Sequence, residues 1–110
     1  MDVELLVVPD CPNQEAAAGL VRGVLDDLGM PDVAVTVSVI SSRADAEHRG
    51  FSGSPTILIN GAEPFAEPAR APAVACRVYR TPAGLRGVPD AAALRAAVID
   101  AARSPGRSQP

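Results

Sequence analysis

The sequence has no tryptophan and no lysine, and its aromatic residues are two phenylalanines and one tyrosine. With so few aromatic side chains, a hydrophobic core has to be built from Val, Leu, Ile and Ala. Hydrophobic residues make up 47% of the chain and charged residues 21%, which is typical of an ordinary globular protein. The 110 residues are enough for one domain and too few for two.

Long hydrophobic runs and clusters of positive charge are also missing. The longest apolar stretches are far shorter than the roughly 20 residues of a membrane-spanning helix. The net charge is −3, and the arginines form no run interleaved with aromatic residues, so nothing favours binding to nucleic acid. The first residues, Met1-Asp2-Val3-Glu4, are acidic where a secretory signal is basic. We therefore expect a cytoplasmic protein with no membrane or nucleic-acid partner.

Residues that could bind a metal, or act with a serine in a hydrolase active site, are scarce as well. The chain has one histidine, His48, and two distant cysteines, Cys11 and Cys76, so no spacing indicates a metal site and no cofactor is implied. The serines have no histidine and aspartate pattern that would predict a serine hydrolase. In a reducing compartment, two cysteines are expected to be free, reactive or transiently paired rather than permanently bridged.

The first third of the chain has clear structural patterns. Residues 3–8 form an almost unbroken apolar run, which predicts a buried central parallel strand. The apolar stripe from Ala17 to Leu28 predicts a helix that ends at Gly29, with Pro12 suited to its first position. Residues 33–40 alternate and predict a strand with one apolar face, nearer the edge of the sheet and parallel to the first strand.

The rest of the chain continues this succession. The remaining predicted elements are a short helix over 43–49 begun by Ser42 and Asp45, strands over 56–60 and 75–80, and a helix capped by Asp90. Between the last two strands, residues 62–74 contain three prolines and predict a long surface loop. Residues 104–110 predict a disordered tail. The order β-α-β-α-β-β-α indicates an α/β domain over 1–103, with a four-stranded mixed sheet flanked by helices.

Cys11 is the strongest candidate for chemistry. It lies in Pro9-Asp10-Cys11-Pro12-Asn13-Gln14, between the first strand and the first helix. The partial positive charge and unpaired N–H groups of a helix N-terminus favour a thiolate, which attacks disulfides, reacts with peroxide and binds soft metals. The charge of Asp10 would act in the opposite direction. The alternative is that Cys11 is a small buried residue at a tight corner.

Two motifs resemble the thioredoxin-like superfamily. The motif around Cys11 stands where thioredoxins carry Cys-x-x-Cys, and Gly53-Ser54-Pro55-Thr56 opens the third strand, where they carry a cis-proline facing the active cysteine. The chain is also similar to small actinobacterial thioredoxin-like proteins, some of which have selenocysteine at the position of Cys11 or are labelled alkylmercury-lyase-like. The resemblance covers about residues 3–102, apart from the 62–74 loop, and implies a bacterial protein with the thioredoxin fold.

The resemblance implies a redox function with one departure. Gln14 stands in place of the second cysteine, so a dithiol cycle within the motif is excluded. What remains is a monothiol redox protein, leaning toward a thiol–disulfide oxidoreductase, in which Cys11 forms a mixed disulfide that an external small thiol or partner protein resolves. The Ser54 backbone would pair with an extended partner segment. The implied substrate-binding residues are Pro12, Asn13, Gln14, Ser54, Pro55 and Thr56.

Cys76 is predicted at the start of the fourth strand, at the far end of a hairpin from Cys11. A disulfide needs Cα atoms within about 7 Å, so a buried structural role is favoured, although the 62–74 loop leaves pairing with Cys11 open. Tyr79 is expected in the core and Arg77 in solvent. Two other functions stay open: a non-catalytic binding module with a groove beside Pro55, and binding of mercury or another soft metal through Cys11 and Cys76.

Overall fold

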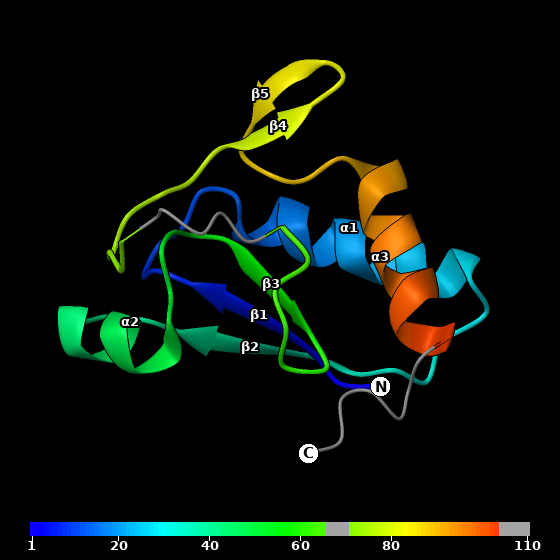
Figure 1. The fold of residues 1–110 in the computed structure, drawn as a ribbon, viewed down its shortest axis with the longest axis horizontal. Helices are drawn as coiled ribbons and strands as arrows, with labels where there is room; N and C mark the ends of the chain where they lie inside the picture. The colour runs from blue at the N-terminus through cyan, green and yellow to red at the C-terminus, as the bar shows by residue number, and fades with distance from the viewer. Residues whose placement is uncertain (66–70, 104–110) are drawn as a thin grey trace.

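The main sheet is built around β1 (Val3–Val7), the buried apolar run near the N-terminus. The computed structural model describes residues 1–65 and 71–103, and within them it has three helices and two small sheets (Figure 1). β2 (Val35–Val39) lies parallel to β1, as predicted, and β3 (Thr56–Ile59) lies antiparallel on its other side. The predicted tail over 104–110, and part of the predicted loop over 62–74, lie outside the described residues.

The side chains of β1 alternate between two hydrophobic clusters. Val3, Leu5 and Val7 pack with residues of α1 (Gln14–Asp27) and α3 (Ala91–Arg103), which lie together beside the sheet (Figure 1). Leu6 points to the other face, where it joins a smaller cluster with α2 (Arg43–Arg49). This smaller cluster consists of Leu6, Ile40, Ala46 and Phe51. The strand period of two therefore divides one apolar run between two layers.

The predicted helix ends are confirmed where a side chain caps the helix. Ser42 Oγ accepts a hydrogen bond from the Asp45 N–H at 3.1 Å, and Gly50 ends α2 with a φ of 64°. At α3, Asp90 Oδ2 accepts from the Ala93 N–H at 3.1 Å. Both serve N–H groups that lack a partner within their own helix. None of the helices in the described residues is long and apolar enough to cross a membrane.

The predicted four-stranded mixed sheet of the thioredoxin fold is wrong for the described residues. The main sheet has three strands, and β4 (Tyr79–Thr81) pairs antiparallel with β5 (Gly84–Arg86) in a separate two-stranded sheet (Figure 1). The predicted strand over 75–80 therefore does not lie antiparallel beside β3. Pro82 and Gly84 carry the missed signal, since these residue types are favoured at the second and fourth positions of a β-turn.

Buried polar anchors explain why the 75–80 segment leaves the sheet. Arg77 is 3% exposed, and its guanidinium donates to the Glu63 carboxylate and to the Phe65 carbonyl oxygen. Tyr79 is buried and donates its hydroxyl to the Pro55 carbonyl oxygen. Tyr79 thus lies in the core as predicted, whereas the expectation that Arg77 is solvated was wrong. A buried guanidinium needs its partners, and these partners fix the path of the chain.

Candidate thiol site

Cys11 lies in the tight connection between β1 and α1. Asp10 adopts a left-handed φ of 56°, which Asp tolerates better than most residues. The Gln14 N–H then donates to the Cys11 carbonyl oxygen at 3.2 Å, and α1 begins at Gln14. Pro12 was predicted at the first position of the helix, but it lies in the turn before α1. The sulfur belongs to this turn, and Cys11 is only 8% exposed.

Ser54 provides the hydrogen bond to the sulfur. Its hydroxyl donates to Cys11 Sγ with an O–S distance of 2.9 Å, and its oxygen accepts from the Val8 N–H at 3.0 Å. Ser54 is completely buried, so its single hydroxyl hydrogen needs an acceptor inside the protein. The described structure supplies that acceptor as the Cys11 sulfur. Two segments 43 residues apart are thus joined at one hydroxyl group.

The main chain of Ser54 is also engaged. Its N–H donates to the Ala75 carbonyl oxygen at 2.7 Å, and its carbonyl oxygen accepts from the Arg77 N–H at 3.0 Å. Ser54 and Cys76 form an isolated parallel bridge. The expectation that the Ser54 backbone is open to a partner segment was therefore wrong. The peptide bond between Ser54 and Pro55 is cis.

Residues 75–77 cross over Ser54, and we call them the crossing segment. Buried Gly53 and Thr56 pack beneath it. A Cβ placed on Gly53 would lie 2.6 Å from the Arg77 Cβ, closer than two carbon atoms can approach, and the Gly53 φ of 154° also disfavours a side chain. Thr56 is buried and donates its hydroxyl to the Gly53 carbonyl oxygen at 2.6 Å, while its oxygen accepts from Arg77 at 3.4 Å. Thr56 therefore supports the crossing segment, although the resemblance implied a contact with substrate.

Asn13 lies against a different part of the fold. A Cβ on Gly87 would fall 2.4 Å from Asn13 Nδ2, so the amide packs onto the chain that leaves the β4–β5 hairpin. Asn13 also lines a cavity of about 390 Å³ between the start of α1, the hairpin and the start of α3. Gln14 is half-buried and Pro12 is exposed. The hydrogen bond to the Cys11 sulfur comes from Ser54, and the cavity beside Asn13 borders the motif.

Cys76 lies next to Ser54, so its predicted place at the far end of a hairpin was wrong. It is exposed, which also contradicts the predicted burial, and both cysteines are free thiols. The reason is the direction of the segment, which crosses Ser54 in parallel where an antiparallel partner of β3 was expected. The sequence had led us to predict that the backbone of Ser54 would pair with a partner segment. A small hydroxyl residue between Gly53 and Pro55 was the signal for its side-chain role.

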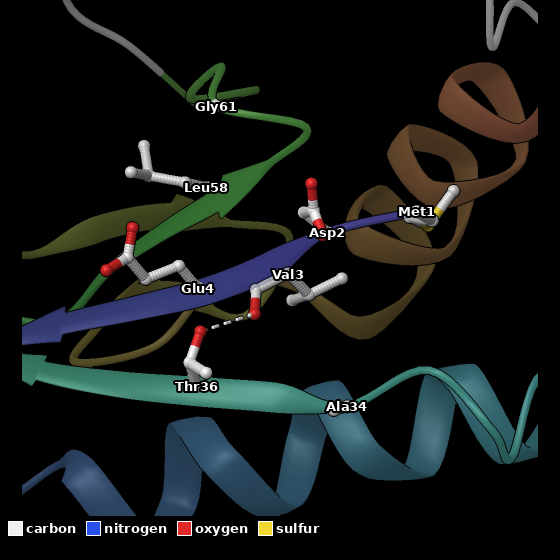
Figure 2. A pocket seen from close by; sticks show the side chains of 8 residues that line it. All are labelled: Met1, Asp2, Val3, Glu4, Ala34, Thr36, Leu58 and Gly61. Atoms are coloured by element: carbon white, nitrogen blue, oxygen red, sulfur yellow. Dashed lines mark hydrogen bonds between the residues drawn. The ribbon is translucent and has the colours of Figure 1, made fainter.

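A second cavity lies at the opposite end of β1. It has a volume of about 430 Å³ and is lined by residues at the start of β1 and β2 and around the end of β3 (Figure 2). In Figure 2 the Thr36 hydroxyl donates to the Val3 carbonyl oxygen, at 3.3 Å. Cys11 follows the other end of β1, so this cavity is separate from the thiol site. The described residues contain no group of three metal-ligating side chains, and His48 is exposed.

Comparison with known proteins leaves the family of this chain open: no family model, no curated protein and no solved structure matches it.

Proposed function

We propose that the protein is a cytoplasmic thiol redox protein whose Cys11 forms a mixed disulfide with a thiol or disulfide partner. The single observation that carries the proposal is the hydrogen bond from the buried Ser54 hydroxyl to Cys11 Sγ. An O–H group aimed at sulfur stabilises negative charge on it, and the thiolate is the form that attacks disulfides. The resemblance of the two site motifs to thioredoxin-like proteins supports the same reaction.

The proposed step is a thiol–disulfide exchange. The Cys11 thiolate attacks one sulfur of a disulfide R–S–S–R′, so a bond forms between Cys11 Sγ and that sulfur. The original S–S bond breaks, and R′–S⁻ leaves and takes up the proton that Cys11 lost. Asp10 and Pro12 flank Cys11 in the chain and are both exposed, so we expect a partner to approach from their side.

This function is favoured over a binding module that takes up a partner strand beside Pro55. The N–H and C=O of Ser54, which such a module would offer, already pair with Ala75 and Arg77. This pairing weighs against that alternative, whose remaining support is the missing second cysteine at Gln14.

The test compares the alkylation rates of Cys11 and Cys76 within the same molecule. Native wild-type protein and Ser54→Ala are labelled with iodoacetamide, and peptide mass spectrometry gives the rate at Cys11 relative to the rate at exposed Cys76. If Ser54 activates the sulfur, the substitution lowers this ratio, by at least threefold. If Ser54 only holds the fold together, the loosened variant exposes Cys11 and the ratio rises. A native wild-type Cys11 that neither alkylates nor accepts glutathione would contradict the proposal.

A further inference from the structure

We propose that Cys76 is the resolving thiol for Cys11, so that the chain completes its dithiol step with a cysteine outside the Cys11 motif. The inference rests on the proposed function, because Cys76 acts on a mixed disulfide that Cys11 has formed. In the step that resolves the mixed disulfide, Cys76 takes the place of the external thiol. The second cysteine missing at Gln14 would thus be supplied by a segment 65 positions after Cys11.

The first argument is placement. Ser54 contacts Cys11 through its side chain and Cys76 through its main chain. Paired strands lie about 4.8 Å apart, so the Cys76 backbone is one strand spacing from the residue that touches the Cys11 sulfur. A disulfide needs Cα atoms within about 7 Å. Closing it requires the Ser54 side chain to turn aside and the crossing segment to shift toward Cys11.

The second argument is the face to which Cys76 points. Side chains of successive residues in extended chains alternate between faces, and directly paired residues share a face. Gly53 and Arg77, each one residue from the bridge, meet on one side, where the Arg77 Cβ occupies the space above Gly53. Ser54 and Cys76 therefore share the opposite side. This is the side on which the Ser54 hydroxyl meets the Cys11 sulfur.

The third argument is the contrast in exposure between two cysteines that share Ser54. Cys11 is 8% exposed, whereas Cys76 is exposed and free. The buried guanidinium of Arg77 fixes the residue that follows Cys76, and the Ala75 carbonyl oxygen is bonded to Ser54. An exposed thiol is thus held beside the site by anchored residues on both sides, an arrangement suited to attack on a neighbouring sulfur.

The resolution step balances as a second exchange. The Cys76 thiolate attacks Cys11 Sγ of the mixed disulfide, and a bond forms between the two cysteine sulfurs. The bond between Cys11 and the substrate sulfur breaks, and R–S⁻ leaves and takes up the proton that Cys76 lost. One disulfide R–S–S–R′ is thereby reduced to two thiols while Cys11 and Cys76 are oxidised to a disulfide. Two equivalents of an external thiol, such as reduced glutathione, return the protein to its starting state.

The experiment follows one equivalent of glutathione disulfide. Reduced wild-type protein, Cys76→Ser and Cys11→Ser are mixed with it, quenched with acid and alkylating agent at intervals, and analysed by intact and peptide mass spectrometry. A matched control, Cys76→Ser with Leu85→Cys, keeps two thiols but moves the second to an exposed position in β5, where Leu85 is 60% exposed. We expect wild type to end as a Cys11–Cys76 disulfide, and its mixed disulfide between Cys11 and glutathione to disappear at a rate independent of protein concentration. Both variants with Cys76→Ser should instead keep glutathione on Cys11 at least tenfold longer.

Two results would overturn the inference while leaving the proposed function intact. In one, the glutathione on Cys11 persists as long in wild type as in Cys76→Ser. In the other, Cys76 is recovered in a disulfide between two chains. If Cys11 takes up no glutathione in wild type or in either Cys76→Ser variant, the proposed function fails and this inference fails with it.

Discussion

At the scale of single residues, the packing of Gly53 against Arg77 determines whether a chain segment can cross the thiol site. The two residues approach so closely that only hydrogen fits in place of a side chain on Gly53. The crossing segment carries Cys76, so this glycine acts on the site through its packing against Arg77. It is a position where the absence of a Cβ has a definite structural reason.

We predict that Gly53→Ala lowers the free energy of unfolding by about 1–3 kcal/mol, because a Cβ at 2.6 Å from the Arg77 Cβ forces the backbone to move. Urea denaturation measures the change. Gly19→Ala is the matched control: Gly19 lies in α1 with nothing within 4 Å of its Cβ position, and there the same substitution should raise stability by about 0.5–1 kcal/mol. Equal effects of the two substitutions would contradict this explanation.

The ion pair between Arg77 and Glu63 makes a second prediction at this scale. The two side chains are 1% and 16% exposed, and Arg77→Met leaves the Glu63 carboxylate without its cation. We expect a loss of about 3 kcal/mol in the free energy of unfolding, measured by urea denaturation. Arg43→Met, at a pair with Glu47 where Arg43 is 82% exposed, should change stability by less than about 0.5 kcal/mol. Similar losses in both variants would argue against a structural role for the buried pair.

At the scale of elements, one carboxylate links β1, β2 and α2. Ser38 Oγ of β2 donates to Glu4 Oε2 at 2.6 Å, and Arg49 at the end of α2 lies 2.6 Å from Glu4 Oε1. The hydrogen bond from Ser38 and the charge of Arg49 lower the pKa of Glu4 below its ordinary value of 4.5, against the opposing effect of burial. The ionised form is therefore bound more tightly in the folded protein than in the unfolded chain.

A pH dependence of stability follows from this lowered pKa. Glu4 contributes stability that is fully present above about pH 5 and is lost as the pH falls below 4.5 through the lower folded value. Because the group is partly exposed, we expect Glu4→Gln to cost about 0.5–1 kcal/mol at pH 7. Urea denaturation at pH 7 and at pH 3 should show this difference shrinking at the lower pH. Glu15→Gln, in the first turn of α1, is the control for removing a carboxylate elsewhere. A difference for Glu4 that grows on acidification would contradict the assignment.

The sequence predicted well those elements whose signals are local. The capping pair Ser42 and Asp45 and the long apolar stripe of α1 depend on neighbours within one or two turns, so they could be read directly. The crossing of residues 75–77 over Ser54 depends instead on partners at Gly53, Glu63 and Phe65, which are distant from it in sequence. A short run such as 75–80 is compatible with a sheet strand or with such a crossing, and only tertiary contacts decide between them.

The candidate site divides in the same way. The position of Cys11 before α1 could be inferred from residue types and spacing, whereas the resemblance to thioredoxin-like proteins pointed to the Gly53-Ser54-Pro55-Thr56 motif. The hydroxyl bond of Ser54 to sulfur and the neighbouring position of Cys76 could not, because each depends on how two separate loops meet. The expected strong apolar face of the strand over 33–40 is also only partly buried, since Val37 and Val39 lie 43% and 54% exposed at the free edge of β2.

At the scale of the whole molecule, the two sheets differ in how firmly they belong to the core. Four of the five residues of β1 are buried, whereas all three residues of β5 are exposed. Stability measured by hydrogen exchange follows burial and local packing. The hairpin is therefore the part of the fold that we expect to open without global unfolding.

We predict that native-state amide hydrogens bonded across β4 and β5 exchange at least tenfold faster than those of β1. Hydrogen–deuterium exchange with mass spectrometry measures both in one experiment. If the fold follows this division, a core truncation such as Leu5→Ala, in the fully buried centre of β1, should speed exchange in β1 and leave the hairpin rates nearly unchanged. Uniform protection of both sheets would mean that they unfold as one unit.

If Cys11 exchanges with disulfides as proposed, the crossing of residues 75–77 over Ser54 has a consequence for which disulfides it accepts. An extended polypeptide is bound mainly through its backbone, and the backbone N–H and C=O of Ser54 are already paired within the molecule. A disulfide within a protein should then bind hardly more tightly than the same disulfide within a small metabolite. Under the proposed function, selection would depend on size and on access past Asp10 and Pro12, and compact disulfides would be favoured.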